Sequence, residues 1–377
     1  MDRIKIFYFI PNLQQGGTEQ QLLRLIRSLP ARFEPVLCLY HDLVFYQDEL
    51  IPGQPRHVLG HKRMNLAGVE ELTRILREER PHILHCYRDK ANFWGRLTAR
   101  RAGVPIVITS SRNRFMQPHL MALERHLSDR ADLILSNSES VKAELVTWAR
   151  VRPEKVQVIY NILDTEFFRP PTPEERQAAR AAWQLGEQQV AFLLPGRISL
   201  QKHQLGLLWS LSSLAHQRRL APQAVFLLAG RRRDPGTARL VDWLRARPGL
   251  RDQVRFLDAQ KDIRSLYWAA DVLTLPSLYE GLSNAALEGC ATGLPAILSR
   301  ATNLDQTIVD GETGFEVPTF WPGPLADAIE RMLALGPGAR QAMGARGRAH
   351  VVARFGRSPT EATVAVYDRL LREKGLA

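Results

Sequence analysis

The chain has 377 residues, enough for two domains of common size, and its charged (24%) and apolar (45%) fractions are typical of a soluble globular protein. The formal net charge of +12 suits an anionic partner: a nucleotide, a nucleic acid or the anionic face of a membrane. Cys38, Cys86 and Cys290 lie far apart, which excludes a disulfide framework or closely spaced metal ligands and favours a reducing cytoplasm.

The N-terminal apolar run ends early, at Pro11, and is not followed by a small-residue cleavage pattern. The chain has no run of 18 apolar residues, the length that a membrane-spanning helix needs. We therefore expect no signal peptide, no transmembrane helix and a cytoplasmic location.

The first half of the chain alternates strand-like and helix-like segments. Strands are expected at 4–10, 34–40, 82–87, 105–111, 131–138 and 156–161, and helices at 18–29, 69–80, 91–103, 118–129 and 140–148. Apolar strands separated by helices indicate an α/β protein with a parallel sheet covered on both faces.

The second half repeats this style, with strands expected at 190–199, 223–231, 254–259, 271–277 and 295–300. The Pro-rich segment 167–175 is the best linker candidate. We expect two doubly wound domains, 1–168 and 169–356, with a last helix, 357–377, packing back on the first. Such sheets bind ligands beyond the carboxyl ends of their strands, so two facing sheets form a cleft and residues just after strands are candidates for chemistry.

Three loops after strands carry candidate residues. Gly16 and Gly17 open a helix, where backbone N–H groups can approach an anion or a polar oxygen, although a plain tight turn explains them equally well. Arg197 and Lys202 would suit a diphosphate at the mouth of a sheet, although two basic loop residues are more often mere surface.

The third loop and the helix pattern that follows it contain two glutamates eight positions apart. Glu280 lies in a loop beside Gly281, and Glu288 lies in an apolar helix pattern. A carboxylate in such a place is costly unless it has a partner, and it accepts well from two vicinal hydroxyls of a ribose or another sugar. The simpler interpretation is a partly exposed glutamate paired with one of the many arginines.

The Glu280-x7-Glu288 segment, "ADVLTLPSLYEGLSNAALEGCATGLPAI", resembles the donor-site signature of retaining glycosyltransferase family 4, with the GT-B fold. Other segments resemble this family in the same order along nearly the whole chain: "GGTEQ", "GVPIVITSSRN", "ADLILSNSESVKAEL", "VIYNILDTEFFRP", "GRISLQKH" and "NLDQTIVDGETGFEVP". The resemblance implies two Rossmann-like domains that face each other across a cleft.

The resemblance also implies roles for single residues. Arg197 and Lys202, in the loop that begins at Gly196, would hold the donor diphosphate and stabilise the leaving nucleotide. Glu288 would bind the ribose. Glu280 would contact the donor sugar and phosphate together with the backbone of Gly281, Leu282, Ser283 and Asn284. Gly16 and Gly17 would border the acceptor and the leaving phosphate.

Two further implications concern metals and histidines. The chain lacks an Asp-x-Asp motif, so we expect a metal-independent enzyme that needs no cofactor. Arg112 stands where many family members have a histidine, and we expect it to contact a phosphate or an acidic acceptor. His85 is the nearest histidine candidate, but a histidine at the end of a strand is more often structural.

The favoured function is transfer of a hexose or N-acetylhexosamine from a nucleotide-sugar, UDP first, to a hydroxyl of a glycan or lipid-linked acceptor with retention, in cell-surface polysaccharide or glycolipid synthesis. One alternative is a GT-B epimerase that acts on a UDP-sugar. Another is a non-catalytic basic protein whose Arg-rich segment 86–130 grips nucleic acid, with Phe93 and Trp94 as stacking groups. The same segment could lie on an anionic membrane.

Overall fold

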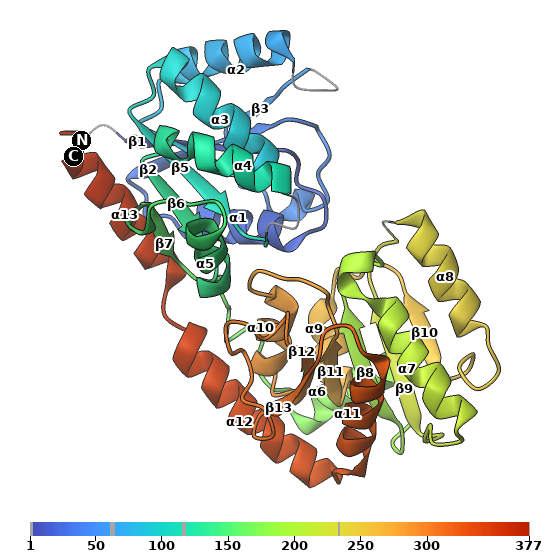
Figure 1. Ribbon diagram of the computed structural model, residues 1–377. Coiled ribbons are helices and arrows are strands. Elements are labelled where there is room, and N and C mark those ends of the chain that lie inside the picture. Colours follow the sequence, from blue (N-terminus) through green and yellow to red (C-terminus); the bar gives the residue numbers. More distant parts are fainter. Residues whose placement is uncertain (1–2, 61–64, 115–117, 233, 377) are drawn as a thin grey trace. The chain divides into compact units, whose positions relative to one another are not determined.

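The computed structural model describes residues 3–60, 65–114, 118–232 and 234–376 (Figure 1). The chain forms two compact units. Unit 1 comprises residues 1–162 together with 358–377, and unit 2 comprises residues 163–357.

In its described part, unit 1 contains a seven-stranded parallel sheet in the order β3-β2-β1-β4-β5-β6-β7. Its strands are β1 (Ile4–Ile10), β2 (Phe33–Leu39), β3 (Arg56–Val58), β4 (Ile83–Tyr87), β5 (Ile106–Ser111), β6 (Leu133–Ser136) and β7 (Val156–Val158). Its α-helices are α1 (Gly17–Arg27), α2 (Leu66–Glu79), α3 (Asp89–Ala102), α4 (Pro118–Leu127), α5 (Glu139–Thr147) and α13 (Pro359–Glu373). Single 3-10 turns occupy Gln47–Glu49, Ser128–Arg130 and Pro153–Lys155.

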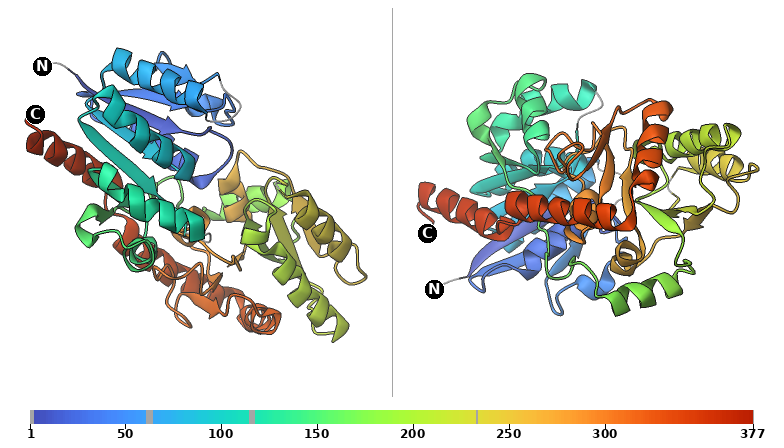
Figure 2. Two further views of the ribbon diagram at one scale, coloured as in Figure 1. Left: turned by 45° about the horizontal axis from the view of Figure 1, so that its top comes forward. Right: turned by 90° about the horizontal axis from the view of Figure 1, so that it is seen from below.

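Alternation along β1 divides the apolar residues of unit 1 between the two faces of the sheet. Ile6, Tyr8 and Ile10 pack with α1 and α13, whereas Phe7 and Phe9 pack with α2 and α3. Successive side chains of a strand point to opposite faces, so an uninterrupted apolar strand needs helices on both (Figures 1 and 2).

Unit 2 repeats this plan with a six-stranded parallel sheet in the order β10-β9-β8-β11-β12-β13. The strands are β8 (Val190–Pro195), β9 (Ala224–Ala229), β10 (Val254–Leu257), β11 (Val272–Leu275), β12 (Ala296–Ser299) and β13 (Gly314–Val317). The α-helices are α6 (Pro173–Ala182), α7 (Gln204–His216), α8 (Pro235–Arg245), α9 (Ile263–Ala269), α10 (Asn284–Ala291), α11 (Pro322–Ala334) and α12 (Pro337–Phe355), with a 3-10 turn at Leu200–Lys202. A core formed by β8, β9, α7, α8 and α11 fills one side of this sheet.

In both sheets, the strands that follow the first strand are added first on one side of it and later on its other side. In unit 1 the chain leaves β1 toward β2 and later returns to place β4 on the other side of β1. In unit 2 it does the same with β8, β9 and β11. Loops that leave a parallel sheet at such a switch point diverge and leave room for a ligand. The loops after β1 and β4, and those after β8 and β11, are therefore where a site is expected.

The predicted α/β class and doubly wound sheets are confirmed, with β3 and β13 as additional short strands. The units divide at Ile162/Leu163, earlier than the predicted 168/169. The segment 167–175 leads into helix α6 instead of forming a linker: Pro173 occupies the first turn of α6, and Thr172 and Glu175 form its capping box. Phe168 is buried within unit 2, against Tyr267.

The last helix belongs to unit 1. The hydroxyl groups of Tyr367 in α13 and Tyr8 in β1 lie 3.2 Å apart in the core of that unit. Among the described residues, no helix is both long and apolar enough to span a membrane.

Candidate functional site

The loop after β8 holds the first pair of predicted donor-site residues. Gly196 has φ of 151°, a conformation that favours glycine, and a Cβ atom there would approach the Lys202 side chain to 3.2 Å. Arg197 follows and is half-buried. The Gln204 side chain donates a hydrogen bond of 2.9 Å to the Arg197 carbonyl and so fixes the turn that leads into α7.

The same loop is tied to the loop after β11. Lys202 Nζ forms an ion pair of 2.6 Å with Glu280 Oε1, and the two side chains are only 13% and 8% exposed. Gln201 reinforces the connection, because its carbonyl accepts from Leu278 N–H at 2.8 Å and its side chain donates to the Tyr279 carbonyl at 3.0 Å. The structure thus brings together Lys202 and Glu280, which the sequence separates by 78 positions.

Glu288 lies in α10, the helix that follows the Glu280 loop. Ser283 caps this helix and accepts a hydrogen bond from Ala286 N–H. Glu288 is buried and accepts a hydrogen bond of 3.3 Å from the hydroxyl of Tyr267 in α9. A Cβ atom at Gly289 would come within 2.7 Å of Leu273, so the small residues of α10 let it pack closely on β11. The partner Tyr267 was not predicted, because it lies on a separate helix and in no recognisable motif.

A second polar group lies near this loop. The Ser277 hydroxyl, just beyond β11, is buried and has no hydrogen-bond partner among the described residues. The backbone of Gly281, Leu282 and Ser283 is buried too, and Asn284 begins α10. Unit 2 therefore gathers two cations, two carboxylates, a hydroxyl and a helix N-terminus at the switch point of its sheet. This set suits a ligand that carries both phosphate groups and hydroxyls.

In unit 1, Gly16 and Gly17 form the turn from β1 into α1. Gly16 is the N-cap, and a Cβ atom there would come within 2.3 Å of Glu19 Oε2. Glu19 is buried and forms an ion pair of 2.6 Å with Arg88, the residue that follows β4. The first turn of α1 and the end of β4 are therefore joined by a Glu–Arg pair that sequence reasoning did not single out.

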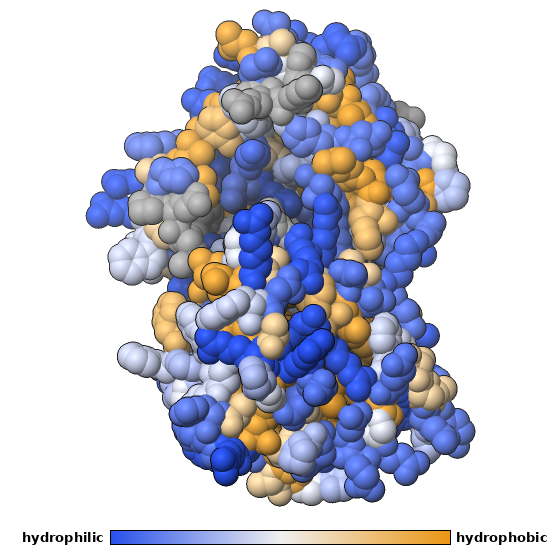
Figure 3. Space-filling view, turned by 90° about the vertical axis from the view of Figure 1, so that its right-hand side faces the viewer, coloured by the Kyte–Doolittle hydropathy of each residue, from blue (hydrophilic) through white to orange (hydrophobic). Residues whose placement is uncertain are grey.

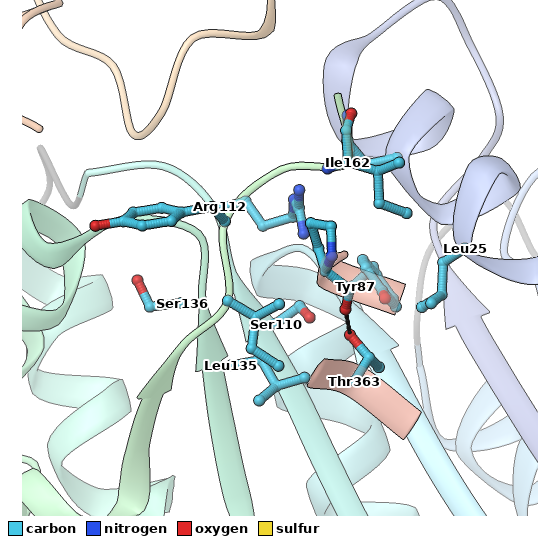
Figure 4. Close-up of a pocket in the computed structure, with 12 residues that line it drawn as sticks. Leu25, Tyr87, Ser110, Arg112, Leu135, Ser136, Ile162 and Thr363 are labelled. Atoms are coloured by element: carbon cyan, nitrogen blue, oxygen red, sulfur yellow. Dashed lines mark hydrogen bonds between the residues drawn. The ribbon is translucent and has the colours of Figure 1, made fainter. Parts of the chain in front are cut away.

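Arg112 lies directly after β5, beside a small polar cavity within unit 1 (Figure 4). Its guanidinium donates to Asn161 Oδ1 at 2.5 Å, and burial lowers its pKa. The cavity holds about 30 Å³ and is also lined by Gln21, Tyr87 and Ser136. That volume accommodates water or the end of a side group. Arg112 is the positive charge of this cavity.

The histidine candidate is a core residue. His85 is fully buried, with one ring nitrogen 2.7 Å from the Tyr367 hydroxyl and the other 2.9 Å from Ser110 Oγ. Burial lowers its pKa to about 3, with a smaller contribution from Arg112. The ring is therefore neutral near pH 7, and its two hydrogen bonds connect β4 with β5 and α13 in the core of unit 1.

The Arg-rich segment 86–130, the alternative nucleic-acid or membrane surface, mixes buried and exposed side chains. Arg96 is buried and forms an ion pair of 2.5 Å with Glu124, while Phe93 and Trp94 are half-buried. Trp94 packs against the core between the sheet, α2 and α3. Arg100 and Arg101, at the end of α3, are exposed, so a nucleic-acid surface on this segment stays a prediction.

Among the described residues, no group of three or more His, Cys, Asp or Glu side chains is arranged to hold a metal ion. The cationic side chains placed at the two switch points are Arg88 in unit 1 and Arg197 and Lys202 in unit 2.

Known proteins with similar sequences were compared with this chain. Residues 15–167 match the family model "Glycosyltransferase Family 4", and residues 189–334 match "Glycosyl transferases group 1". Relatives include proteins named D-inositol 3-phosphate glycosyltransferase from Streptomyces bingchenggensis (32% identity, 66% of this chain, 55% of the relative) and Corynebacterium diphtheriae (30% identity, 59% and 52%). The chain spans about half the length of these curated relatives.

Solved structures show the same fold. The Anabaena protein HepE, solved with UDP-glucose, matches with a TM-score of 0.85 at 19% identity, over 97% of this chain and 99% of that one. Sucrose-phosphate synthase of Thermosynechococcus elongatus matches with a TM-score of 0.83 at 20% identity, over 98% and 100%. The two family models account for both halves of the sequence, and the chain belongs to the family 4 (group 1) glycosyltransferases, whose fold is GT-B.

Proposed function

We propose that this protein transfers a hexose or N-acetylhexosamine from a nucleotide-sugar to an acceptor hydroxyl, with retention of the anomeric configuration. One observation carries the proposal: the buried Lys202–Glu280 ion pair joins the loops after β8 and β11, next to the helix that holds Glu288. Family membership supports glycosyl transfer as the chemistry.

The donor is proposed to lie on unit 2. Glu288 accepts from the two vicinal hydroxyls of the ribose, and the Tyr267 hydroxyl orients the carboxylate from the other side. UDP is the favoured nucleotide, because a protein with this fold, HepE, has been solved with UDP and with UDP-glucose. Arg197 and Lys202 bind the diphosphate, Arg197 as a planar fork and Lys202 as a point charge.

The chemical step is proposed to occur on one face of the sugar. The bond between the anomeric carbon and the phosphate oxygen breaks, the acceptor oxygen bonds to that carbon on the same face, and the departing phosphate takes the acceptor proton. An oxocarbenium-like transition state separates charge, and the side-chain cations stabilise the leaving diphosphate. This arrangement requires no metal ion. Glu280 keeps Lys202 in position and contacts the sugar hydroxyls; it is not assigned as a nucleophile.

The acceptor is proposed to meet unit 1, near Gly16, Gly17 and Arg112. Arg112 would contact a phosphate or carboxylate group on the acceptor, a glycan or a lipid-linked sugar. The names of the relatives support an anionic acceptor, since they refer to an inositol phosphate. Cell-surface polysaccharide or glycolipid synthesis in the cytoplasm is the setting we infer, and the three free, buried thiols agree with a reducing compartment.

The test is product analysis with a panel of UDP-, GDP-, ADP- and CMP-linked sugars, each incubated with and without a mixture of anionic and neutral glycan acceptors. We expect one nucleotide series to give an acceptor-dependent product whose anomeric configuration, measured by NMR, equals that of the donor. A product with inverted configuration would contradict retention. Conversion of the donor sugar with no acceptor present would favour an epimerase instead.

A further inference from the structure

Helix α8 of unit 2 presents large apolar and cationic side chains to solvent on one stripe. Leu240 and Trp243 are 52% and 59% exposed, and Arg239 and Arg247 are exposed beside them. The Arg247 guanidinium lies 4.1 Å from the centre of the Trp243 ring. Residues three and four positions apart share a helix face, so Arg239, Leu240 and Trp243 lie on one side of α8, and Arg247, just beyond the end of the helix, lies over Trp243.

The opposite face of α8 packs against the core of unit 2. Ala238, Val241 and Leu244 are buried in the core that α8 shares with α7 and α11. The exposed Leu240 and Trp243 therefore contribute little to that core. Single exposed apolar residues are common, but a tryptophan and a leucine on one stripe with two arginines form an amphipathic, basic helix surface.

The charge around α8 is positive. Among the described residues of 231–252, the arginines outnumber the aspartates: Arg231, Arg232, Arg239, Arg245, Arg247 and Arg251 against Asp234, Asp242 and Asp252. One of these aspartates, Asp242, is already paired with Arg232. The surface is therefore complementary to an anionic partner.

Exposed aromatic side chains also occur on α7 and just before α11. Trp209 in α7 is exposed, as are Phe320 and Trp321 at the start of α11. The Ser210 hydroxyl donates to the Pro322 carbonyl at 2.8 Å, which brings the start of α11 against the middle of α7. Figure 3 views the molecule from the side on which α8 lies, and apolar residues are interspersed there among hydrophilic ones.

We propose that α8 is a membrane-docking helix that lies on an anionic phospholipid surface. Tryptophan and leucine enter the interface between headgroups and acyl chains, and arginines on the same stripe bind lipid phosphates. We assign the membrane contact to α8 and not to segment 86–130, because Leu240 and Trp243 are exposed whereas Phe93 and Trp94 are half-buried. Docking through α8 is independent of which acceptor the enzyme uses.

The first test is flotation of the full-length protein with phosphatidylcholine vesicles, with and without phosphatidylglycerol. We expect binding only to the anionic vesicles, lost at high salt. Arg239→Gln/Arg247→Gln is expected to weaken it roughly thirtyfold. Lys90→Gln/Arg100→Gln removes the same charge from exposed positions of α3 and is expected to leave binding nearly unchanged. An α3 variant that loses as much binding as the α8 variant would overturn the proposal, as would absence of wild-type flotation.

The second test reports insertion directly. Because the native cysteines are all buried, a polarity-sensitive thiol dye labels an introduced cysteine selectively. The dye on Leu240→Cys is expected to shift to the blue on anionic vesicles, whereas the dye on Trp148→Cys, an exposed position in unit 1, is expected not to shift. Equal shifts would overturn the proposal. So would a change from dimer to monomer caused by Leu240→Ser/Trp243→Ser, measured by light scattering without vesicles, since α8 would then bind a second copy.

Discussion

Units 1 and 2 have the same sheet plan but different chemistry at their switch points. Unit 2 joins the loops after β8 and β11 through Lys202 and Glu280, 2.6 Å apart, with Glu288 buried in the next helix. Unit 1 joins the first turn of α1, the helix after β1, to Arg88 after β4 through Glu19, also at 2.6 Å. The fold determines where the loops meet, whereas their side chains determine what they bind. Changes in unit 2 should therefore affect the donor, and changes in unit 1 the acceptor.

The largest effect is expected from breaking the ion pair of unit 2. Lys202→Met leaves Glu280 buried without its partner, and breaking such a pair costs about 3–5 kcal/mol of unfolding free energy. Urea denaturation of the wild type and the variant measures this cost. Lys202→Met/Glu280→Gln is expected to recover most of the lost stability, because no buried charge remains unpaired. Purely additive losses in the double variant would show that the two side chains are not coupled.

Loss of Arg197 is expected to slow the chemical step. Arg197→Ala removes the cation proposed to stabilise the leaving diphosphate, and kcat should fall by roughly 10²–10³, about 2.7–4 kcal/mol. Arg300→Ala, which removes a solvent-exposed arginine of the same unit, serves as the control. Steady-state kinetics with saturating acceptor give the comparison. A fall in kcat of less than about tenfold (roughly 1.4 kcal/mol) would remove Arg197 from the proposed role.

The equivalent change in unit 1 should affect the acceptor instead. With an anionic acceptor, Arg112→Gln is expected to raise the acceptor KM by roughly tenfold to a hundredfold, because one hydrogen bond to a charged group is lost. The nucleotide-induced rise in melting temperature should stay unchanged. Lys90→Gln, at an exposed position of unit 1, is the matched control. An altered nucleotide effect in Arg112→Gln would contradict the division of tasks between the units.

Acid should destabilise unit 1 through His85. Its pKa is about 3 in the folded state because of burial, below the ordinary value of 6.5, so the unfolded state binds a proton first as the pH falls. The stabilisation is complete above pH 6.5 and is lost progressively below it, by about 1.4 kcal/mol near pH 5.5. Urea midpoints at pH 7.5 and 5.5 measure this loss, and His85→Gln should reduce it. If the variant loses as much stability as the wild type between pH 7.5 and 5.5, groups other than His85 cause the loss.

The smallest effect is expected from the hydrogen bond to Glu288. Tyr267→Phe removes only the hydroxyl that donates to this carboxylate at 3.3 Å. The nucleotide Kd should rise roughly fivefold, about 1 kcal/mol. Tyr46→Phe in unit 1, which loses a hydroxyl near Gly16 N–H, should leave the nucleotide Kd unchanged. Calorimetric titration distinguishes the two variants.

Much of the fold could be predicted from the sequence because its signals are local. Apolar strands such as 4–10 and 190–199, each followed by a helical pattern, indicate a doubly wound sheet without knowledge of distant contacts. The strands β3 and β13 were missed because they are short, and β3 has an exposed, polar start. The proline content of 167–175 indicates a linker, yet proline also begins helices, as Pro173 does here.

The candidate site was predictable only where residues follow strands. Arg197, Lys202, Glu280 and Glu288 each lie in, or shortly after, a loop that leaves unit 2's sheet. Contacts between distant parts of the chain could not be predicted in this way. Tyr267, the hydrogen-bond partner of Glu288, lies on a different helix, and Arg88 pairs with Glu19 only because β1 and β4 are neighbours in the sheet. The burial of Arg96 against Glu124 is equally invisible in a count of charges along the chain.

The most direct test of the central claim, that unit 2 binds a nucleotide through Glu288, is a thermal shift with UDP, GDP, ADP and CMP on the wild type and Glu288→Gln. One nucleotide, present at about 100 times its Kd, should stabilise the wild type by roughly 2.7 kcal/mol. In Glu288→Gln the nucleotide should give no such stabilisation, whereas the melting temperature without nucleotide should equal that of the wild type. An equal shift in the variant, or no shift with any nucleotide, would contradict the account.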